Sequence, residues 1–329
     1  MKSLRIDDLH FVRWEDNPIM APQGDSWEAK DVFNPAAIVR DGRVHLLYRA
    51  EDFSGAGQWN GTSRIGLATS EDGLHFTRDA EPIVSPSEDY ELPGGCEDPR
   101  VVKAEGRYWL TYTGYDGTNA RLCLASSADL KTWEKHGVLF PELEWSKSGA
   151  ILDVPIDGQY LMYFGDTHLW LARSTDLVRW QLDPEPVLSP REGLFDSRLV
   201  EPGPPPLLTD EGILLIYNAA RWPDTRYAVG SAVFDPNDPR RVLRRLDAPF
   251  LEPEEVSERE GQVNQVVFVE GLVYHAERWL LYYCSPEPDI EPAEQAAQRA
   301  AREAEKKKWN DSKQAMGSFG AGGKGVKSP

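Results

Sequence analysis

Two apolar runs separated by a short polar turn form a pattern that recurs five times in this chain of 329 residues. Every copy ends at a tyrosine, and the turns hold Asp-Gly, Glu-Gly or similar pairs, which are typical of antiparallel β-hairpins. A unit that returns at intervals of roughly 50 to 65 residues predicts that one structural module is built five times. The copies span residues 35–48, 99–112, 150–163, 204–217 and 263–283.

A second pattern follows three of these hairpins, at residues 65–76, 122–133 and 169–180. Each copy holds a Ser-x-Asp turn with an aromatic residue four positions later, which indicates a third strand leading into a fourth. Two hairpins per repeat give a four-stranded antiparallel sheet. Five such sheets predict an all-β fold, a five-bladed β-propeller. A β-sandwich with a coincidental repeat is the alternative fold.

The end of the chain departs from the repeat. Residues 1–284 are predicted to form the propeller domain, and residues 285–329 a separate tail. The Ala/Glu/Arg/Lys-rich run at 294–308 suits a solvent-exposed helix, and the Gly/Lys/Ser-rich end is expected to be disordered. The fifth repeat lacks a second hairpin, so residues 4–20 are expected to complete the ring.

The charge of the chain excludes several classes of partner. A net charge of −18 and a pI near 4.8 argue against binding to nucleic acid or to anionic membranes. Three cysteines provide no disulfide framework, and the six histidines show no ligand-like spacing, so no metal or cofactor is expected. Without an apolar leader or an apolar span, a cytoplasmic location is the expectation.

Polar side chains recur at equivalent ends of the predicted inner strands, where they would converge on one pocket. A ring of acidic and amide groups suits a polyhydroxylated ligand, whose hydroxyls need many donors and acceptors. Trp59, Trp145 and Trp170 are possible platforms for sugar rings, although core packing is the more common use of tryptophan. The candidate residues at strand heads and hairpin ends are Asn34, Arg49, Asp52, Glu97, Asp98, Tyr115, Asp116, Lys147, Asp166, Glu201, Asn218 and Asn264.

The run Gly-Gly-Cys-Glu-Asp-Pro-Arg at residues 94–100 is the sharpest local feature. Two glycines allow close backbone approach, and Pro99 fixes the entry to the next strand. Burying three charged residues without partners would cost several kcal/mol, so they are either mutually paired or functional. From the residues alone, a structural Glu97–Arg100 pair and a functional Asp98 both remain open.

Several separated motifs in the same order resemble glycoside hydrolase family 130. They are residues 94–101, the five hairpins, residues 112–116 followed by 120–122, and Glu252-Pro253 with residues 258–261. The resemblance covers about residues 10–283 and implies a five-bladed propeller that acts on β-mannosides, with small manno-oligosaccharides as substrates. It further implies that Asp98 is the catalytic acid and delivers its proton through the 3-hydroxyl of the mannose.

The resemblance leaves the acceptor, water or phosphate, to be decided. A phosphorylase must hold a dianion with Arg, Lys or His, and the His-Arg-Pro run common in the family's phosphorylases is replaced here by a segment ending in Asp166-Thr167-His168. Together with Glu201 this pattern favours an inverting hydrolase of β-1,2-linked mannosides with Glu201 as the base that activates water. Candidates for the alternative, a phosphorylase that releases mannose 1-phosphate with inorganic phosphate as co-substrate, are Lys147, Arg121 and His168, and Arg64 and Arg100 complete the predicted substrate-binding set.

Two other classes of protein remain open. A sugar-binding propeller without catalysis would keep the aromatic and amide groups but would not need Asp98. An arabinan- or fructan-type glycosidase can share the architecture, because a fold does not determine a substrate, but the Cys-Glu-Asp-Pro-Arg run argues against it.

Overall fold

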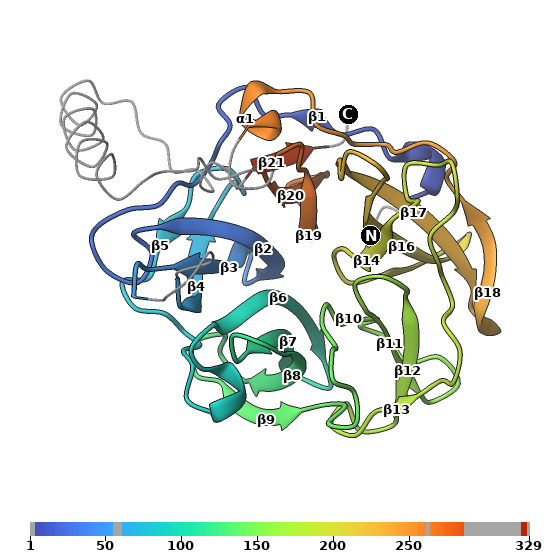
Figure 1. Ribbon diagram of the computed structural model, residues 1–329, viewed down its shortest axis with the longest axis horizontal. Helices are drawn as coiled ribbons and strands as arrows, with labels where there is room; N and C mark the ends of the chain where they lie inside the picture. The colour runs from blue at the N-terminus through green and yellow to red at the C-terminus, as the bar shows by residue number, and fades with distance from the viewer. Residues whose placement is uncertain (1–3, 55–60, 261–263, 286–323, 328–329) are drawn as a thin grey trace.

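Antiparallel β-strands make up nearly all the regular structure of the computed structural model, which describes residues 4–54, 61–260, 264–285 and 324–327. Figure 1 shows the strands gathered in groups around the centre of the molecule, with β2, β6, β10, β14 and β19 innermost. This confirms the prediction of a mostly β chain with several antiparallel sheets.

The first two groups of strands follow the predicted hairpins at residues 35–48 and 99–112. Their outer strands follow the second sequence pattern, and the two groups join where Ser63 pairs in parallel with Gly95, which gives one eight-stranded sheet. The strands are β2 (Asp31–Arg40), β3 (Arg43–Glu51), β4 (Ser63–Ser70) and β5 (Thr77–Arg78), then β6 (Gly95–Ala104), β7 (Arg107–Tyr115), β8 (Ala120–Ser127) and β9 (Glu134–Val138).

The third and fourth groups form separate sheets of four and five strands. The third holds β10 (Ala150–Ile151), β11 (Tyr160–Phe164), β12 (Trp170–Ser174) and β13 (Gln181–Leu182). The fourth holds β14 (Leu199–Pro202), β15 (Leu207–Thr209), β16 (Gly212–Ala220), β17 (Tyr227–Asp235) and β18 (Asp238–Arg245).

The fifth group brings the two ends of the described chain together. Its strand order is β1 (Val12–Arg13), β21 (Lys324–Lys327), β20 (Arg278–Cys284) and β19 (Phe268–His275). An N-terminal strand joins the last sheet, as expected, but it does so through β21 and not by pairing with β20. Residues 324–327 of the predicted tail pair as β21 with the edge of β20. The helix predicted at 294–308 lies outside the described residues.

Helical segments are short and lie between the strand groups. They are η1 (Ile6–Asp8), η2 (Asp89–Glu91) and α1 (Val256–Arg259). None of the helices in the described ranges is long and apolar enough to cross a membrane.

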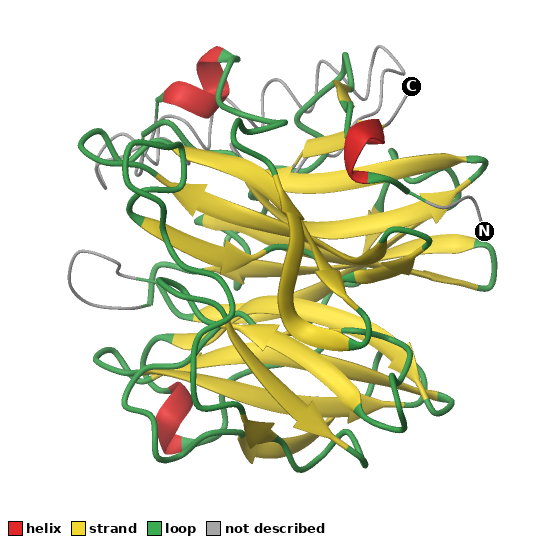
Figure 2. Cartoon of the chain, turned by 90° about the vertical axis from the view of Figure 1, so that its right-hand side faces the viewer, coloured by secondary structure: helices red, strands yellow, loops and turns green. Residues whose placement is uncertain are grey.

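The tyrosines that end the five sequence repeats are all fully buried, and they explain why the repeat ends at this residue type. Four of them donate their hydroxyl group to a carboxylate, as Tyr48 does to Glu28 (2.9 Å) and Tyr112 to Glu91 (2.7 Å). In the third group Tyr163 instead bonds to the carbonyl of Pro239. Apolar clusters fill the space between neighbouring sheets, which Figure 2 shows as stacked layers of strands.

Candidate active site

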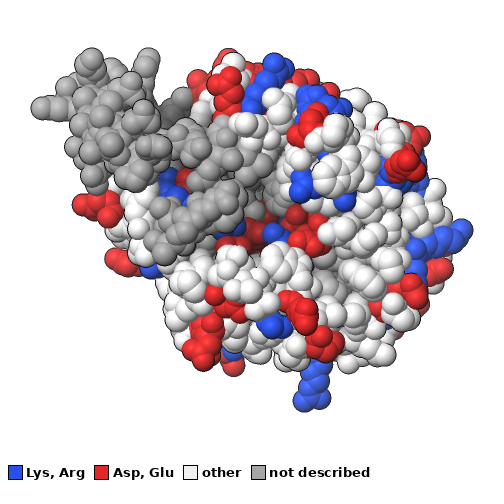
Figure 3. Space-filling model, viewed as in Figure 1, with Lys and Arg blue, Asp and Glu red and all other residues white. Residues whose placement is uncertain are grey.

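A cavity of about 420 Å³ lies where the innermost strands meet, and all five strand groups contribute to its lining. Figure 3 shows acidic and basic side chains next to one another in a hollow near the middle of this face. The lining residues are Asp31, Phe33, Asn34, Arg49, Glu51, Glu97, Asp98, Tyr115, Ala120, Trp145, Lys147, Glu201, Tyr227, Val266, Phe268, Cys284 and Ser285.

A left-handed backbone conformation recurs at the heads of the inner strands. The φ angles are 50° at Asn34, 49° at Asp98, 59° at Ser148 and 61° at Gln265. In β2 and β6 the residue sits in a β-bulge, where the pairing register shifts against the neighbouring strand. Asn and Asp are the non-glycine residues that best tolerate this conformation. The bulge changes the direction of the side chain and places Asn34 and Asp98 in the cavity wall.

Asp98 is only 3% exposed and is held by three neighbours. Its Oδ1 accepts hydrogen bonds from Asn34 Nδ2 (2.8 Å) and Arg49 Nη1 (2.9 Å), and its Oδ2 lies 3.2 Å from Lys147 Nζ. Burial alone would favour the neutral acid, but the positive charges of Lys147, Arg49 and Arg100 outweigh it and hold the pKa of Asp98 well below its usual range. These positive charges therefore favour the ionised form of the carboxylate.

Glu201 faces the same lysine from β14. Lys147 Nζ lies 3.6 Å from Glu201 Oε1, which also accepts a hydrogen bond from the hydroxyl group of Ser148. Burial raises the pKa of Glu201, although Lys147 and Arg100 partly oppose the shift. The same lysine keeps its own charge, because Glu201 and Asp98 overcome the desolvation that would lower its pKa. Lys147 thus bridges the two carboxylates proposed from the sequence as acid and base.

Arg49 organises a second cluster of acids beside Asp98. Its Nη2 lies 2.7 Å from Glu51 and 2.8 Å from Glu97, and Glu51 in turn pairs with Lys30 at 2.8 Å. Burial raises the pKa of Glu97 to about 7, against the opposing charge of Arg49. On this wall of the cavity, Glu51 and Glu97 are therefore both neutralised by Arg49, and Glu51 also by Lys30.

Arg100 lies beneath the cavity and does not form the pair with Glu97 that the sequence left open. It is 1% exposed and donates to the carbonyl groups of Pro202 (2.6 Å) and Gly203 (3.0 Å), which ties β6 to the segment that carries Glu201. Its carboxylate partner is Glu270 on β19, at 3.2 Å. The bulge between Glu97 and Arg100 separates the two side chains, which explains why the short sequence spacing was misleading.

Seven of the predicted site residues line the cavity: Asn34, Arg49, Glu97, Asp98, Tyr115, Lys147 and Glu201. The structure places the others outside its lining, each with a different partner. Asp52 and Arg64 pair with each other at 2.7 Å, and Asp116 caps its own turn by accepting the N–H groups of Thr118 and Asn119.

Two predicted asparagines also lie outside the lining. Asn218 is fully buried and exchanges two hydrogen bonds with the backbone of Val269, which joins β16 to β19. Asn264 is exposed and is not part of the lining.

Two of the cations proposed to hold phosphate also lie outside the lining. Arg121 donates to the carbonyl of Leu143 at 2.8 Å, and His168 contacts the hydroxyl group of Ser189 at 2.9 Å. Local carbonyl and hydroxyl acceptors engage these side chains, so of the three predicted phosphate-binding groups only Lys147 lines the cavity.

The tryptophans predicted to stack on sugar rings lie in different surroundings. Trp145 lines the cavity and donates its Nε1–H to Asp166 at 2.6 Å. Asp166 is not itself a lining residue, but this hydrogen bond holds the indole ring of Trp145 in the cavity wall. Trp170 packs against an apolar cluster of the third group. Trp59 lies outside the described residues.

Several lining residues were missing from the sequence-based set, among them Asp31, Phe33, Glu51, Tyr227, Phe268 and Ser285. Glu51 had a readable signal, because residues two apart in a strand share a face and Arg49 was already a candidate. Tyr227 begins β17, a strand that the repeat pattern did not define, whereas Phe268 begins β19 within the hairpin predicted at residues 263–283.

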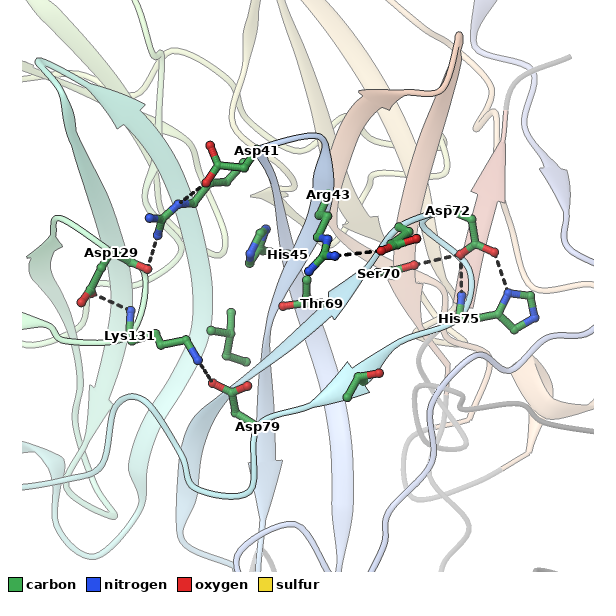
Figure 4. Close-up of a pocket in the computed structure, with 14 residues that line it drawn as sticks. Asp41, Arg43, His45, Thr69, Ser70, Asp72, His75, Asp79, Asp129 and Lys131 are labelled. Atoms are coloured by element: carbon green, nitrogen blue, oxygen red, sulfur yellow. Dashed lines mark hydrogen bonds and ion pairs between the residues drawn. The ribbon is translucent and has the colours of Figure 1, made fainter. Parts of the chain in front are cut away.

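A second cavity, of about 1070 Å³, lies over β2–β5 and the turn at Asp129 (Figure 4). Its charged side chains pair with one another, including Arg43 with Glu71 (2.8 Å) and Lys131 with Asp79 (2.9 Å). This arrangement gives a surface groove held by ion pairs, without the buried carboxylates that mark the central cavity.

Comparisons with known proteins agree with a carbohydrate-cleaving site. A family model described as beta-1,4-mannooligosaccharide phosphorylase matches residues 12–291. A 1,2-beta-oligomannan phosphorylase from Thermoanaerobacter sp. (strain X514) is 37% identical, over 84% of this chain and 93% of the relative. A beta-1,2-mannobiose phosphorylase from the same organism is 33% identical, over 86% of this chain and 96% of the relative.

A solved structure shows the same likeness. It comes from work described as "The GH130 family of mannoside phosphorylases contains glycoside hydrolases that target beta-1,2 mannosidic linkages in Candida mannan". It superposes with a TM-score of 0.81 and 37% identity, over 96% of this chain and 93% of the other.

Fold, site and relatives together define an enzyme that cleaves mannosides. The chain belongs to glycoside hydrolase family 130, whose members are β-mannoside phosphorylases and β-mannosidases. The resemblance found in the sequence is thereby confirmed. Of the two activities predicted, the relatives support the phosphorylase more directly than the hydrolase that the sequence motifs favoured.

Proposed function

We propose that this protein cleaves β-1,2-linked manno-oligosaccharides with inversion and transfers the mannosyl unit to phosphate, releasing mannose 1-phosphate. The observation that carries the proposal is the setting of Asp98, a buried carboxylate at the cavity wall in contact with Asn34, Arg49 and Lys147. The phosphorylases among the relatives support the choice of phosphate as acceptor.

In this mechanism Asp98 is the acid that protonates the departing sugar through the 3-hydroxyl of the mannose. Because the surrounding positive charges favour the ionised form of Asp98, it must take up a proton when substrate and phosphate bind. Phosphate drawn to Lys147 would weaken the attraction between that lysine and Asp98. Removing a neighbouring positive charge raises the pKa of a carboxyl group, which prepares Asp98 to act as an acid.

The spacing of the two carboxylates bears on the choice between phosphate and water. Asp98 Oδ2 and Glu201 Oε1 lie 3.2 Å and 3.6 Å from the same Lys147 Nζ, so their separation cannot exceed these two distances combined. An inverting hydrolase holds its two carboxyl groups about 6.5–9.5 Å apart to leave room for water. The largest separation that these distances allow falls just inside the lower end of that range, so the spacing is compatible with either acceptor. Phosphate is itself a nucleophile and needs no such base.

Hydrolysis is the second candidate, and the charge balance of the cavity favours it. Five carboxylates line the wall, and the two cations among the lining residues, Arg49 and Lys147, each contact at least two of them. A dianion would have to displace some of these contacts. In this alternative Glu201 would serve as the base, as proposed from its motif. The similar solved structure, described as work on glycoside hydrolases of this family, supports hydrolysis as an activity.

We also propose that the five strand groups are the blades of a propeller, formed by residues 1–284 and completed by β21. The radial placement of the inner strands supports this interpretation.

The decisive experiment incubates the protein with β-1,2-mannobiose in the presence and absence of phosphate. We expect mannose 1-phosphate only when phosphate is present, whereas free mannose released equally fast without phosphate would replace the proposal by hydrolysis. Asp98→Asn should lower kcat by about 10²–10⁴-fold, the usual contribution of a general acid. Asp116→Asn, a matched change outside the cavity lining, should leave it unchanged. Equal activity of the two variants would remove Asp98 from the mechanism.

A further inference from the structure

Two tryptophans in the described part of the chain are strongly exposed. Trp145, with 50% of its surface exposed, lines the cavity, whereas Trp222, with 62% exposed, lies outside the lining. Trp222 is in the loop between β16 and β17, and the next strand begins with Tyr227, which does line the cavity. The exposed indole therefore belongs to the same hairpin end as a wall residue.

Hydrogen bonds and an ion pair hold the loop that carries Trp222 in place. The backbone N–H of Trp222 donates to the hydroxyl group of Ser197 at 3.1 Å, and Arg221 pairs with Asp224 at 2.7 Å. The guanidinium group of Arg198 lies 4.8 Å from the centre of the indole ring and donates to Thr225 Oγ1 at 2.7 Å. An exposed aromatic held in this way has already lost much of the freedom that binding would otherwise remove.

Arg198 connects the indole to the cavity. Its backbone N–H bonds to the carbonyl of Ala220 at 2.9 Å, and Ala220 pairs across the hairpin with Tyr227. Burial raises the pKa of the Tyr227 hydroxyl group, and the positive charge of Arg198 opposes this shift. Arg198 thus packs on Trp222 at the surface, while its backbone bonds to the residue that pairs with Tyr227 of the cavity wall.

We propose that Trp222 and Arg198 form a distal subsite for a mannosyl unit of substrates longer than a disaccharide. A fixed indole face complements the C–H face of a sugar ring, and a guanidinium group can donate hydrogen bonds to the hydroxyls around that ring. The inference rests on the proposed function, because it extends the substrate beyond the cavity at which the bond is cleaved.

A subsite remote from the reacting bond binds the ground state and the transition state equally. Such binding lowers KM and leaves kcat unchanged. Trp222→Ala should therefore lower kcat/KM for β-1,2-mannotetraose roughly five- to tenfold, almost entirely through KM. Mannobiose, which is too short to reach Trp222, should be cleaved as by the wild type.

The test compares kcat and KM for the di-, tri- and tetrasaccharides, with saturating phosphate present. Leu208→Ala is the matched control, because this side chain is 47% exposed on β15 of the same strand group and away from the β16–β17 loop. Trp222→Phe should recover part of the loss, and thermal unfolding should show that every variant is folded. Equal kinetics of Trp222→Ala and wild type on the tetrasaccharide, or equal losses on all three sugars, would overturn the subsite.

A failure of the proposed function would look different, since no β-1,2-mannoside would then be cleaved with or without phosphate. In that case calorimetric titration of mannotetraose into wild type and Trp222→Ala decides the inference. Weaker binding by the variant alone supports the subsite, and identical or absent binding overturns it.

Discussion

Glu270 is a buried carboxyl group beneath the cavity with an unusual set of contacts. Its Oε1 accepts a hydrogen bond from Asn34 (3.0 Å) and faces Arg100 (3.2 Å), while its Oε2 has no hydrogen-bond partner among the described residues. Burial raises its pKa to about 8, with Arg100 opposing the shift and the charges of Asp98 and Glu201 adding to it. Through Asn34 and Arg100, Glu270 supports the backbone and side chain of Asp98.

This raised pKa predicts a specific dependence of stability on pH. Between its ordinary value of 4.5 and about 8, Glu270 keeps its proton in the folded protein and loses it in the unfolded chain. The free energy of unfolding must therefore fall as the pH rises through this window, by at most about 1.4 kcal/mol per pH unit from this group. Glu270→Gln keeps the acceptor toward Asn34 and Arg100 and removes the titration.

We expect the thermal midpoint of Glu270→Gln to decline less than that of wild type between pH 5 and 8. Glu97 and Glu201, whose pKa values are also raised, contribute the same trend to both proteins. The exposed Glu81→Gln provides the control and should follow the wild-type curve. If the curves for Glu270→Gln and wild type are parallel, Glu270 is ionised in the folded protein.

At the scale of the strand, Gly95 is the point where the first two strand groups are joined. Its φ of +111° and its parallel pairing with Ser63 leave no room for a side chain, because a Cβ there would collide with the backbone N and O of Ser63. Gly95 also lies three residues before Asp98 in β6. The junction between the groups therefore helps to set the position of the catalytic candidate.

Gly95→Ala should destabilise the protein by at least about 2 kcal/mol more than Gly106→Ala. Gly106 also has a left-handed φ, of +74°, but nothing lies within 4 Å of the position its Cβ would take. The second variant thus reports the backbone cost alone, about 1–2 kcal/mol. Chemical denaturation measures both, and equal losses would show that the Ser63 contact can relax.

The repeated hairpins could be predicted from sequence because each carries its own local signals, a turn pair and a terminal tyrosine. The direction of individual side chains could not, because each bulge reverses the alternation of faces along a strand. The bulges at Asn34 and Asp98 are examples. Asp52 was chosen where Glu51 faces the cavity, although alternation from Arg49 points to Glu51, and Asn218 was assigned to the cavity although it bridges two strands. Asp98 was found because its motif, and not its strand position, identified it.

At the scale of the molecule, β21 connects the N-terminal strand to the last sheet. Val12 and Arg13 pair with residues 326 and 327, and β20 pairs with the other edge of the same strand. Arg13 also binds Glu258, which accepts the hydroxyl group of the buried Tyr283. The two ends of the described chain thus contribute jointly to one strand group.

A chain ending at residue 323 should consequently be less stable than the full chain. A loss of about 1–2 kcal/mol would lower the thermal midpoint by roughly 2–4 °C for each kcal/mol. A chain ending at Lys327 retains β21 and should melt like the full-length protein. Identical melting of the two truncated chains would show that β21 adds nothing to stability.

The left-handed residues at the heads of the inner strands also set limits for directed evolution of this enzyme. Asn34, Asp98 and Ser148 occupy backbone positions that Val, Ile and Thr enter only at considerable cost. Libraries intended to change the acceptor should therefore keep Asp98, the proposed acid, and sample Gly, Asn, Asp and Ser at Asn34 and Ser148. Wider diversity belongs at lining residues with ordinary backbone geometry, such as Tyr115, Tyr227 and Phe268.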